Sequence, residues 1–269
     1  GFSFNFLSNQ DSPKQSVTSK SVRYYEKEEL QSPSNRLPFD WIESTFLASL
    51  LEERYHEELV YREFLVHNSL PLRCVDMSVS SYRKATDDDR EIIDETIDIQ
   101  TGIYEGGRKV WECSLDLVAY LAEENILDEL QPVLTLELGC GHGLPGCYVL
   151  RKVRMSVPNS VVVLTDYNES VVLDATISNI VLNTQPGSHE TGETISIKDV
   201  IPHVAIGAGD WIDMSKKLGD RVSDSKISDS KFDLILTAET VYTEEAARET
   251  ARVIREHLKS TGVAYVATK

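Results

Sequence analysis

Between Trp111 and Lys269, short apolar runs alternate with stretches in which apolar residues recur every three or four positions. The short runs are typical of strands buried on both faces of a parallel sheet, and the longer stretches are typical of helices that cover such a sheet. Strands are expected at 132–139, 160–166, 203–211, 231–242 and 262–269, and helices at 111–125, 144–153, 168–183 and 243–260. This alternation predicts an α/β fold with a Rossmann-like doubly wound sheet, which binds ligands at the carboxyl ends of its strands.

Two segments interrupt the alternation. Residues 184–200 form a polar insertion, and the stretch rich in Ser, Asp and Lys that follows Trp211 is expected to be a loop. The chain stops at the end of a hydrophobic strand, which is unfavourable at an uncovered sheet edge. We therefore expect the last strands of the fold to be missing from this sequence.

The first hundred residues follow a different pattern. Residues 8–38 are rich in Ser, Pro, Gln and Lys and are expected to be flexible. Apolar residues recur at roughly helical spacing in 40–67, including Ile42, Phe46 and Leu50, which predicts one long helix or two short ones. Strands are expected at 72–79 and 92–100, and the acidic run at 87–89 lacks EF-hand spacing, which favours a solvated turn. The expected division is a flexible segment at 1–39, an extension of helix and strand at 40–100, and the doubly wound domain at 101–269.

Composition narrows the class of protein. No apolar run approaches the roughly 20 residues of a membrane helix, and the N-terminal residues do not resemble a signal peptide. None of the four cysteines forms a C-x-x-C pair and the histidines show no H-x-x-x-H spacing, so a zinc site is not expected. We expect a chain with reduced cysteines that is located in the cytoplasm and nucleus. The net charge of −17 disfavours nucleic acid and favours a basic protein partner, unless the acidity serves only solubility.

The stretch LELGCGHGLPG, residues 136–146, is the strongest chemical signal. Read from Gly141 it matches the dinucleotide pattern G-x-G-x-x-G, and read from Glu137 it matches the S-adenosylmethionine loop E-x-G-x-G-x-G. In both patterns, glycines let the backbone turn sharply beside the ligand and a helix N-terminus supplies free N–H groups. Asp166, at the end of the next expected strand, fits ribose binding in both readings.

Three features favour S-adenosylmethionine over NAD(P) or a site without cofactor. Glu137 precedes the glycines, where a carboxylate suits a methionine ammonium and does not suit a pyrophosphate. Pro145 places the helix start near Gly143, which leaves Gly146 as a small packing residue. Finally, Asp210 follows the third strand, where its carboxylate can accept the exocyclic amine of adenine with Trp211 as an apolar wall.

Four segments together resemble the histidine protein methyltransferases of the seven-strand S-adenosylmethionine superfamily: TGIYEGGRKVWECSLDLVAYL, LELGCGHGLPG, TDYN and FDLILTAETVY, with FSFNF near the N-terminus as a looser likeness. The resemblance covers residues 101–269 and implies a class I methyltransferase fold. It also implies transfer of a methyl group to a histidine of a large-subunit ribosomal protein. The segment Glu239–Tyr242 is the E-x-x-Y form that the resemblance associates with the histidine enzymes, whereas related lysine methyltransferases carry D-x-x-Y.

The candidate site follows from these motifs. Glu239 is expected to contact the target imidazole and stabilise its positive charge. Its alternative roles are binding the methionine end of the cofactor or capping the next helix. Tyr242 is expected either to border the target ring or only to pack against neighbouring side chains. Gly106 and Gly107 are expected to form a turn over the cofactor, and His142 is not expected to be catalytic. The residues expected at the cofactor are Trp111, Glu137, Gly139, Cys140, Gly141, Gly143, Asp166, Tyr167, Asp210, Trp211 and Thr237.

Three hypotheses about function remain open at this point. The first is a histidine methyltransferase, a monomer that uses S-adenosylmethionine and acts on a basic ribosomal protein without binding nucleic acid or membrane. The second is a protein-lysine methyltransferase of the neighbouring group. The third is a non-catalytic factor that binds the ribosomal protein through its acidic surface.

Overall fold

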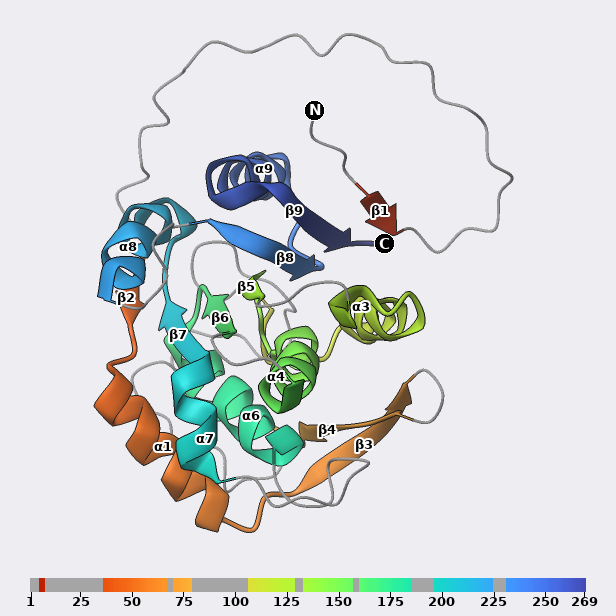
Figure 1. Ribbon diagram of the computed structural model, residues 1–269, viewed down its shortest axis with the longest axis vertical. Helices are drawn as coiled ribbons and strands as arrows, with labels where there is room; N and C mark the ends of the chain where they lie inside the picture. The colour runs from red at the N-terminus through yellow and green to blue at the C-terminus, as the bar shows by residue number, and fades with distance from the viewer. Residues whose placement is uncertain are drawn as a thin grey trace, which may run out of the picture.

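The computed structural model describes residues 5–7, 36–66, 70–78, 106–128, 133–156, 160–184, 196–224 and 231–269. Within these residues, one sheet has the strand order β1-β9-β8-β5-β6-β7-β2 (Figure 1). Its strands are β1 (Asn5–Leu7), β2 (Asp40–Trp41), β5 (Leu134–Leu138), β6 (Val161–Asp166), β7 (Val204–Ala208), β8 (Phe232–Ala238) and β9 (Leu258–Ala267). All neighbouring strands are parallel except β2, which runs antiparallel to β7. The predicted Rossmann-like fold is confirmed.

The order of the strands reverses at β5, the central strand of the sheet. From β5 the chain proceeds outward through β6 to β7, and it then returns to the other side of β5 to form β8 and β9. Every residue of β5 is buried, as expected for a strand covered on both faces. Such a reversal opens a crevice at the carboxyl ends of the two strands beside it, and ligands of doubly wound sheets bind there.

Helices cover both faces of the sheet (Figure 1). One face carries α3 (Glu112–Glu123), α4 (Leu144–Ser156) and the helix formed by α5 (Glu169–Val171), the π-helical turn η4 (Val172–Thr176) and α6 (Ile177–Thr184). The opposite face carries α8 (Trp211–Asp224) and α9 (Glu244–His257). The loop expected after Trp211 is therefore wrong: Met214 and Leu218, one helical turn apart, are fully buried against the sheet. Two apolar anchors in a polar stretch stabilise this helix only because the sheet lies beneath them.

The N-terminal extension packs against the helical face. Helix α1 (Ser44–His56) lies against α6 and α7 (Ile197–Val200), and a hairpin of β3 (Tyr61–Val66) and β4 (Leu70–Val75) lies against α6 through β4. Short 3-10 turns at Ile126–Asp128 and Ile201–His203 complete the described elements.

Helix α1 and strand β4 are confirmed in this extension, and two expectations about it are wrong. The helical spacing predicted for 40–67 ends at His56, because the following segment pairs as β3 with β4. Within α1, the buried residues are Leu47 and Leu51, whereas Phe46 is 53% exposed. The strand expected at 92–100 and the acidic run at 87–89 lie outside the described residues.

The end of the segment expected to be flexible is part of the sheet domain. Phe39 is fully buried, and the strand β2 that follows it adds an edge to β7. Glycines permit this approach: a Cβ on Gly209 would lie 2.4 Å from both Phe39 Cα and Pro38 O, and one on Gly207 would lie 2.3 Å from Phe39 Cζ. The expected boundary at residue 39 is therefore wrong for residues 36–39.

A short strand forms each edge of the sheet. Strand β1 pairs in parallel with β9, the strand that was expected to be left uncovered, and β2 pairs with β7 at the opposite edge. Short strands on each edge limit the unpaired backbone that a sheet presents to other chains. Among the described helices, none is both long and apolar enough to cross a lipid bilayer.

Candidate functional site

A cavity of about 470 Å³ lies at the carboxyl ends of β5, β6, β7 and β8. It brings together most of the residues that the sequence motifs point to, although they are spread over more than 130 positions of the chain. The predicted residues that line it are Trp111, Glu137, Gly139, Cys140, Gly141, Asp166, Tyr167, Asp210, Trp211, Glu239 and Tyr242. Gly143 and Thr237 do not line it.

The glycine loop between β5 and α4 has a backbone that other residues rarely adopt. Gly139, Gly141 and Gly143 have φ angles of 59°, 51° and 64°, in the left-handed region. Space is also limited, because a Cβ on Gly139 would lie 2.6 Å from Thr240 Cγ2 and one on Gly141 would lie 3.1 Å from Gly107 O. Helix α4 begins at Leu144, next to Gly143, as predicted. Gly143 lies on the side of the turn that packs against Thr176, and it therefore does not reach the cavity.

Gly146 has a larger role than the packing role expected for it. Its backbone N–H donates a 2.7 Å hydrogen bond to Glu137 Oε2. A Cβ on Gly146 would lie 2.3 Å from Leu164 Cδ2 and 2.5 Å from that same carboxylate oxygen. The absence of a side chain at Gly146 therefore lets the first turn of α4 approach the acidic side chain of β5. This contact gives a structural reason for the last glycine of the G-x-G-x-x-G pattern.

Glu137 is a buried acid at the cavity wall. Its residue is only 2% exposed, and burial raises the pKa of its carboxyl group to about 8, helped by the charge of Asp166 and opposed by the Gly146 N–H. A buried carboxyl group with a raised pKa is a group that gains from a cationic partner. This is the property expected of a residue that meets a methionine ammonium.

Asp166 fastens the end of β6 to the glycine loop. Its Oδ2 accepts a 2.8 Å hydrogen bond from Gly141 N, and its Oδ1 accepts a 3.1 Å bond from Asn168 N. The side chain is nearly fully buried and still lines the cavity. The residue predicted for ribose binding therefore also holds the loop in its left-handed conformation.

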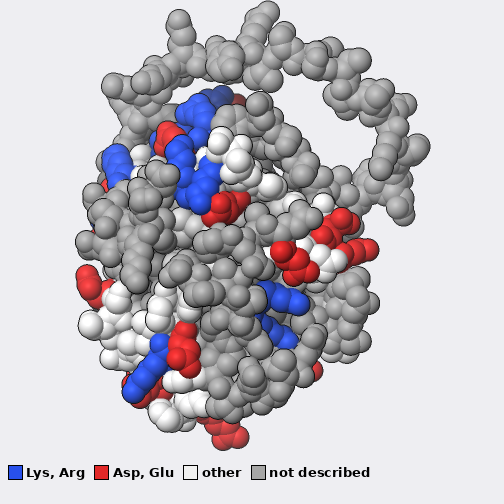
Figure 2. All heavy atoms as spheres, in the orientation of Figure 1, with Lys and Arg blue, Asp and Glu red and all other residues white. Residues whose placement is uncertain are grey.

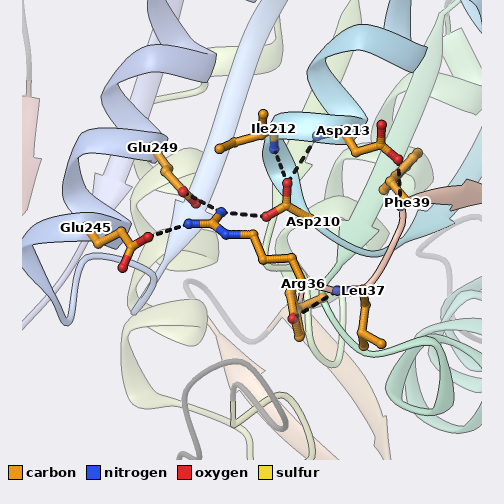
Figure 3. A network of polar contacts seen from close by, with 9 residues as sticks. Arg36, Leu37, Phe39, Asp210, Ile212, Asp213, Glu245 and Glu249 are labelled. Carbon is orange, nitrogen blue, oxygen red and sulfur yellow. Dashed lines mark hydrogen bonds and ion pairs between the residues drawn. The ribbon is translucent and has the colours of Figure 1, made fainter. Parts of the chain in front are cut away.

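Asp210 forms the start of α8 and is engaged on both oxygens (Figure 3). Its Oδ1 accepts hydrogen bonds from the backbone N–H groups of Ile212 and Asp213, at 2.9 and 3.1 Å, which is the geometry of a helix N-cap. Its Oδ2 lies 2.6 Å from Nη1 of Arg36. Arg36 lines the same cavity, and sequence reasoning missed it because its Ser- and Pro-rich surroundings indicate a flexible tail. The available signal was the apolar cluster that follows it, from Leu37 to Ile42.

The turn at 106–110 lies against the glycine loop, where Gly107 O is 3.1 Å from the position that a Cβ on Gly141 would take. Trp111 Nε1 donates a 3.0 Å hydrogen bond to Gly106 O, and Lys109 Nζ lies 4.6 Å from the centre of the Trp111 ring. A Cβ on Gly107 would lie 2.8 Å from Val171 Cγ1. Trp111 is half-buried and lines the cavity, so it forms part of the cavity wall and is not a core residue.

His142 joins three parts of the site. Its Nε2 lies 2.9 Å from Arg108 O, and its Nδ1 lies 3.1 Å from Cys74 Sγ and 3.3 Å from Asn179 Nδ2. A bond from Nε2–H to Arg108 O leaves Nδ1 as an acceptor, and burial lowers the pKa of the ring, which favours this neutral form. The histidine thus links the N-terminal hairpin and the 106–110 turn to the glycine loop, with both ring nitrogens in use.

Glu239 lies at the exit of β8 in a strained conformation. Its φ of 56° is unusual for a residue other than glycine, and its backbone N–H donates to Ala267 O at 2.9 Å. The Cys113 thiol donates a 2.7 Å hydrogen bond to Oε1 of its side chain. Non-glycine residues in this region of backbone space cluster at functional sites. Tyr242, 39% exposed, lines the mouth of the cavity three residues later.

Thr237, which was expected at the cofactor, does not line the cavity. Its side chain is fully buried, and its hydroxyl group donates to Leu138 O at 3.0 Å and contacts the Thr240 hydroxyl. The cavity is lined instead by the next three residues, 238–240, at and beyond the end of β8. Thr237 therefore ties β8 to β5 below the site.

Comparison with known proteins agrees with this geometry. Residues 92–269 match the family model described as lysine methyltransferase. A histidine protein methyltransferase 1 homolog of Dictyostelium discoideum is 36% identical over 182 residues, which cover 68% of this chain and 48% of the relative. Histidine protein methyltransferase 1 of Saccharomyces cerevisiae is 37% identical over 134 residues, covering 48% of this chain and 34% of the relative. The chain thus spans half or less of the length of these curated relatives.

Among solved structures, a TehB-like SAM-dependent methyltransferase from Corynebacterium glutamicum is one that can be aligned with this chain. It aligns with a TM-score of 0.33 and 20% identity over 56% of this chain and 60% of that chain. The resemblance to histidine protein methyltransferases is confirmed by the named relatives. Since the family model covers residues 92–269, well over half of the 269 residues, this chain belongs to the family described as lysine methyltransferase.

Proposed function

We propose that this chain is the S-adenosylmethionine-dependent domain of a protein methyltransferase that modifies a histidine side chain of a basic large-subunit ribosomal protein. The observation that carries the proposal is the position of Glu239. Its carboxylate lies on the wall of the cavity that also holds Glu137 and Asp166, and it is held there by a strained backbone and by Cys113.

The residues present fit S-adenosylmethionine, which supplies a methyl group on a positively charged sulfur. Glu137 is a buried acid that gains from an ammonium group, and Asp166 offers carboxylate oxygens to ribose hydroxyls. The volume of about 470 Å³ is within the range of small-molecule sites, which extends from roughly 300 to 1,000 Å³. Trp111 and Trp211 add apolar walls, which help to keep water out of the site.

The chemistry assigned to the chain itself is alignment and charge stabilisation. A neutral imidazole attacks through one ring nitrogen, and the Glu239 carboxylate accepts a hydrogen bond from the N–H of the other. As the ring becomes cationic, the same carboxylate stabilises the charge and takes up the proton that the ring must lose. Cys113 donates its hydrogen bond to Oε1 of Glu239, so Oε2 is the oxygen assigned to the substrate ring.

The surface charge favours a basic partner. Helix α3 and its C-terminal end carry the exposed acidic residues Glu112, Asp116, Glu123 and Glu124 and no Lys or Arg; of these four, Glu112 pairs with Lys269 at 2.7 Å. Figure 2 shows acidic side chains gathered where Figure 1 places α3. Because α3 starts directly after Trp111 at the cavity, its first acidic residues, Glu112 and Asp116, are the ones nearest the site, and the charge along the helix favours a basic protein chain.

Methyl transfer with product mapping tests the proposal. The chain is incubated with methyl-labelled S-adenosylmethionine and large-subunit ribosomal proteins, and mass spectrometry locates the label. We expect methyl-histidine, and we expect Glu239→Gln to lower the rate at least about 100-fold while S-adenosylhomocysteine still binds. Glu244→Gln, an exposed carboxylate on α9, is the matched control and should change little. Methyl-lysine as the product would overturn the choice of substrate, and cofactor binding without transfer would favour a binding factor.

A further inference from the structure

Arg36 joins two walls of the cavity from a distant part of the chain (Figure 3). Its Nη1 lies 2.6 Å from Asp210 Oδ2 and 2.6 Å from Glu249 Oε1, and its Nη2 contacts Glu245 Oε1. Asp210 begins α8, whereas Glu245 and Glu249 belong to α9. The guanidinium group therefore bridges the two helices that cover one face of the sheet, at the point where both reach the cavity.

The ion pairs of Arg36 with Asp210 and Glu249 are largely buried, and its pair with Glu245 is exposed. The side chains of Arg36, Asp210 and Glu249 are 17%, 9% and 10% exposed, whereas that of Glu245 is 56% exposed. Burial raises the pKa of Glu249, and the charge of Asp210 raises it further, while Arg36 opposes both effects. Without the guanidinium, two buried carboxylates would face each other unpaired, which is costly.

The backbone of this segment is itself fastened to the site. Asp210 N donates to Leu37 O at 3.0 Å, Leu37 N donates to the Tyr167 hydroxyl at 3.3 Å, and Phe39 N donates to Asp213 Oδ2 at 3.0 Å. Together with the burial of Phe39 against Gly207 and Gly209, these bonds hold the backbone from which the Arg36 side chain extends. Arg36 thus reaches the cavity from an anchored segment.

We propose that Arg36 is a positioning residue that aims the Asp210 carboxylate at the adenine amine of the cofactor. Oδ1 of Asp210 is occupied by two backbone N–H groups, and Oδ2 accepts Arg36. A carboxylate oxygen has two acceptor positions, so Oδ2 keeps one for a donor in the cavity. Its direction is set by the two backbone bonds to Oδ1 together with the Arg36 bond to Oδ2. The segment before β2 is in this way part of the cofactor site. This inference rests on the proposed use of S-adenosylmethionine.

Calorimetry with two ligands separates positioning from simple stabilisation. S-adenosylhomocysteine carries the adenine amine, and S-inosylhomocysteine carries a carbonyl in its place. We expect the wild-type chain to prefer the first ligand, and Arg36→Ala to reduce that preference about tenfold, because the Asp210 carboxylate loses its fixed direction. Equal weakening of both ligands, or an unchanged preference, overturns the proposal. Wild-type binding of neither ligand overturns the proposed function as well.

Two further variants control for folding and charge. Arg36→Gln combined with Glu249→Gln removes the guanidinium and one of its two buried partners, Asp210 being the other, so the net buried charge stays the same. We expect a normal thermal transition and a reduced preference for the adenine ligand. Arg248→Ala removes an arginine on α9 that pairs only across the exposed helix surface with Glu244 at 2.6 Å, and it should leave the preference unchanged. A retained preference in the folded double variant would overturn the role of Arg36.

Discussion

The thiol of Cys113, in the first turn of α3, donates a 2.7 Å hydrogen bond to the carboxylate of Glu239, at the exit of β8. Burial, together with the hydrogen bond to Glu239 and the charge of that carboxylate, raises the pKa of this thiol to about 12, so the proton stays on sulfur at neutral pH. Cys113 is therefore a hydrogen-bond donor to the proposed catalytic carboxylate and not a nucleophile. One oxygen of Glu239 is held, and the other remains for the substrate.

Replacing Cys113 should separate catalysis from cofactor binding. Cys113→Val keeps the size of the side chain and removes the donor, so we expect kcat for methyl transfer to fall about tenfold, since a hydrogen bond to a charged group is worth roughly 1.5–3 kcal/mol. The dissociation constant of S-adenosylhomocysteine should not change. Cys113→Ser, which restores a donor, should recover most of the rate. Equal rates in the valine variant and the wild type would show that the contact does not position Glu239.

Removing the Asp166 carboxylate should abolish measurable cofactor binding. Asp166→Ala removes the proposed ribose contact. It also removes the carboxylate that accepts hydrogen bonds from the backbone N–H groups of Gly141 and Asn168 in the wild-type chain. We expect the affinity for S-adenosylhomocysteine to fall at least about 100-fold by calorimetry. Unchanged affinity would show that the end of β6 does not hold the ribose. The exposed Asp116→Ala on α3 is the matched control.

Cofactor binding should release a proton through Glu137. With a pKa of about 8, this carboxyl group is mostly protonated at pH 7, and an ammonium partner requires it to ionise. Calorimetry of S-adenosylhomocysteine in buffers of different ionisation enthalpy should therefore report release of close to one proton at pH 7. The release should vanish above pH 9 and in Glu137→Gln. Proton-neutral binding by the wild type at pH 7 would argue against the ammonium contact.

The same group should make stability fall with pH. Because the folded-state pKa of Glu137 is raised from 4.5 to about 8, the folded chain binds the proton more tightly than the unfolded chain does. This contribution is fully present below pH 4.5 and is lost as the pH rises toward 8. Relative to Glu137→Gln, which is neutral throughout, the wild type should lose free energy of unfolding across this window. Denaturant melts at pH 5 and pH 9 measure the difference in free energy of unfolding between the wild type and Glu137→Gln. A difference that is the same at both pH values would contradict the raised pKa of Glu137.

Gly146 should not tolerate even one added methyl group. In Gly146→Ala the new Cβ would meet Leu164 Cδ2 at 2.3 Å and Glu137 Oε2 at 2.5 Å, so α4 must move away from the sheet. We expect a loss of roughly 2–3 kcal/mol in the free energy of unfolding and a weaker cofactor affinity. Thermal melts and calorimetry check both. An alanine variant as stable as the wild type would mean that the first turn of α4 shifts freely.

The sequence pattern predicted the elements that carry their own periodicity. The strands β5 to β9 each contain a mostly apolar run, and α9 has a Thr243 cap whose side chain accepts from Ala246 N, so local chemistry indicates each of them. Helix α8 was missed although Trp211, Met214 and Leu218 recur at helical spacing, because Ser, Asp, Lys and Gly fill most of the other positions and favour a loop. Segment 36–39 was missed because its order depends on glycines in a strand 170 positions later.

By itself, the sequence determined the doubly wound fold, the glycine loop and the carboxylates at the strand ends, because strand period, left-handed glycines and strand-to-helix turns are local properties. The partners of those carboxylates were decided only by the tertiary structure. Gly146 approaches Glu137, Cys113 meets Glu239, and Arg36 reaches Asp210 only after the sheet has formed. Hydrogen bonds and ion pairs between residues far apart in the chain depend on packing geometry, and no local pattern encodes them.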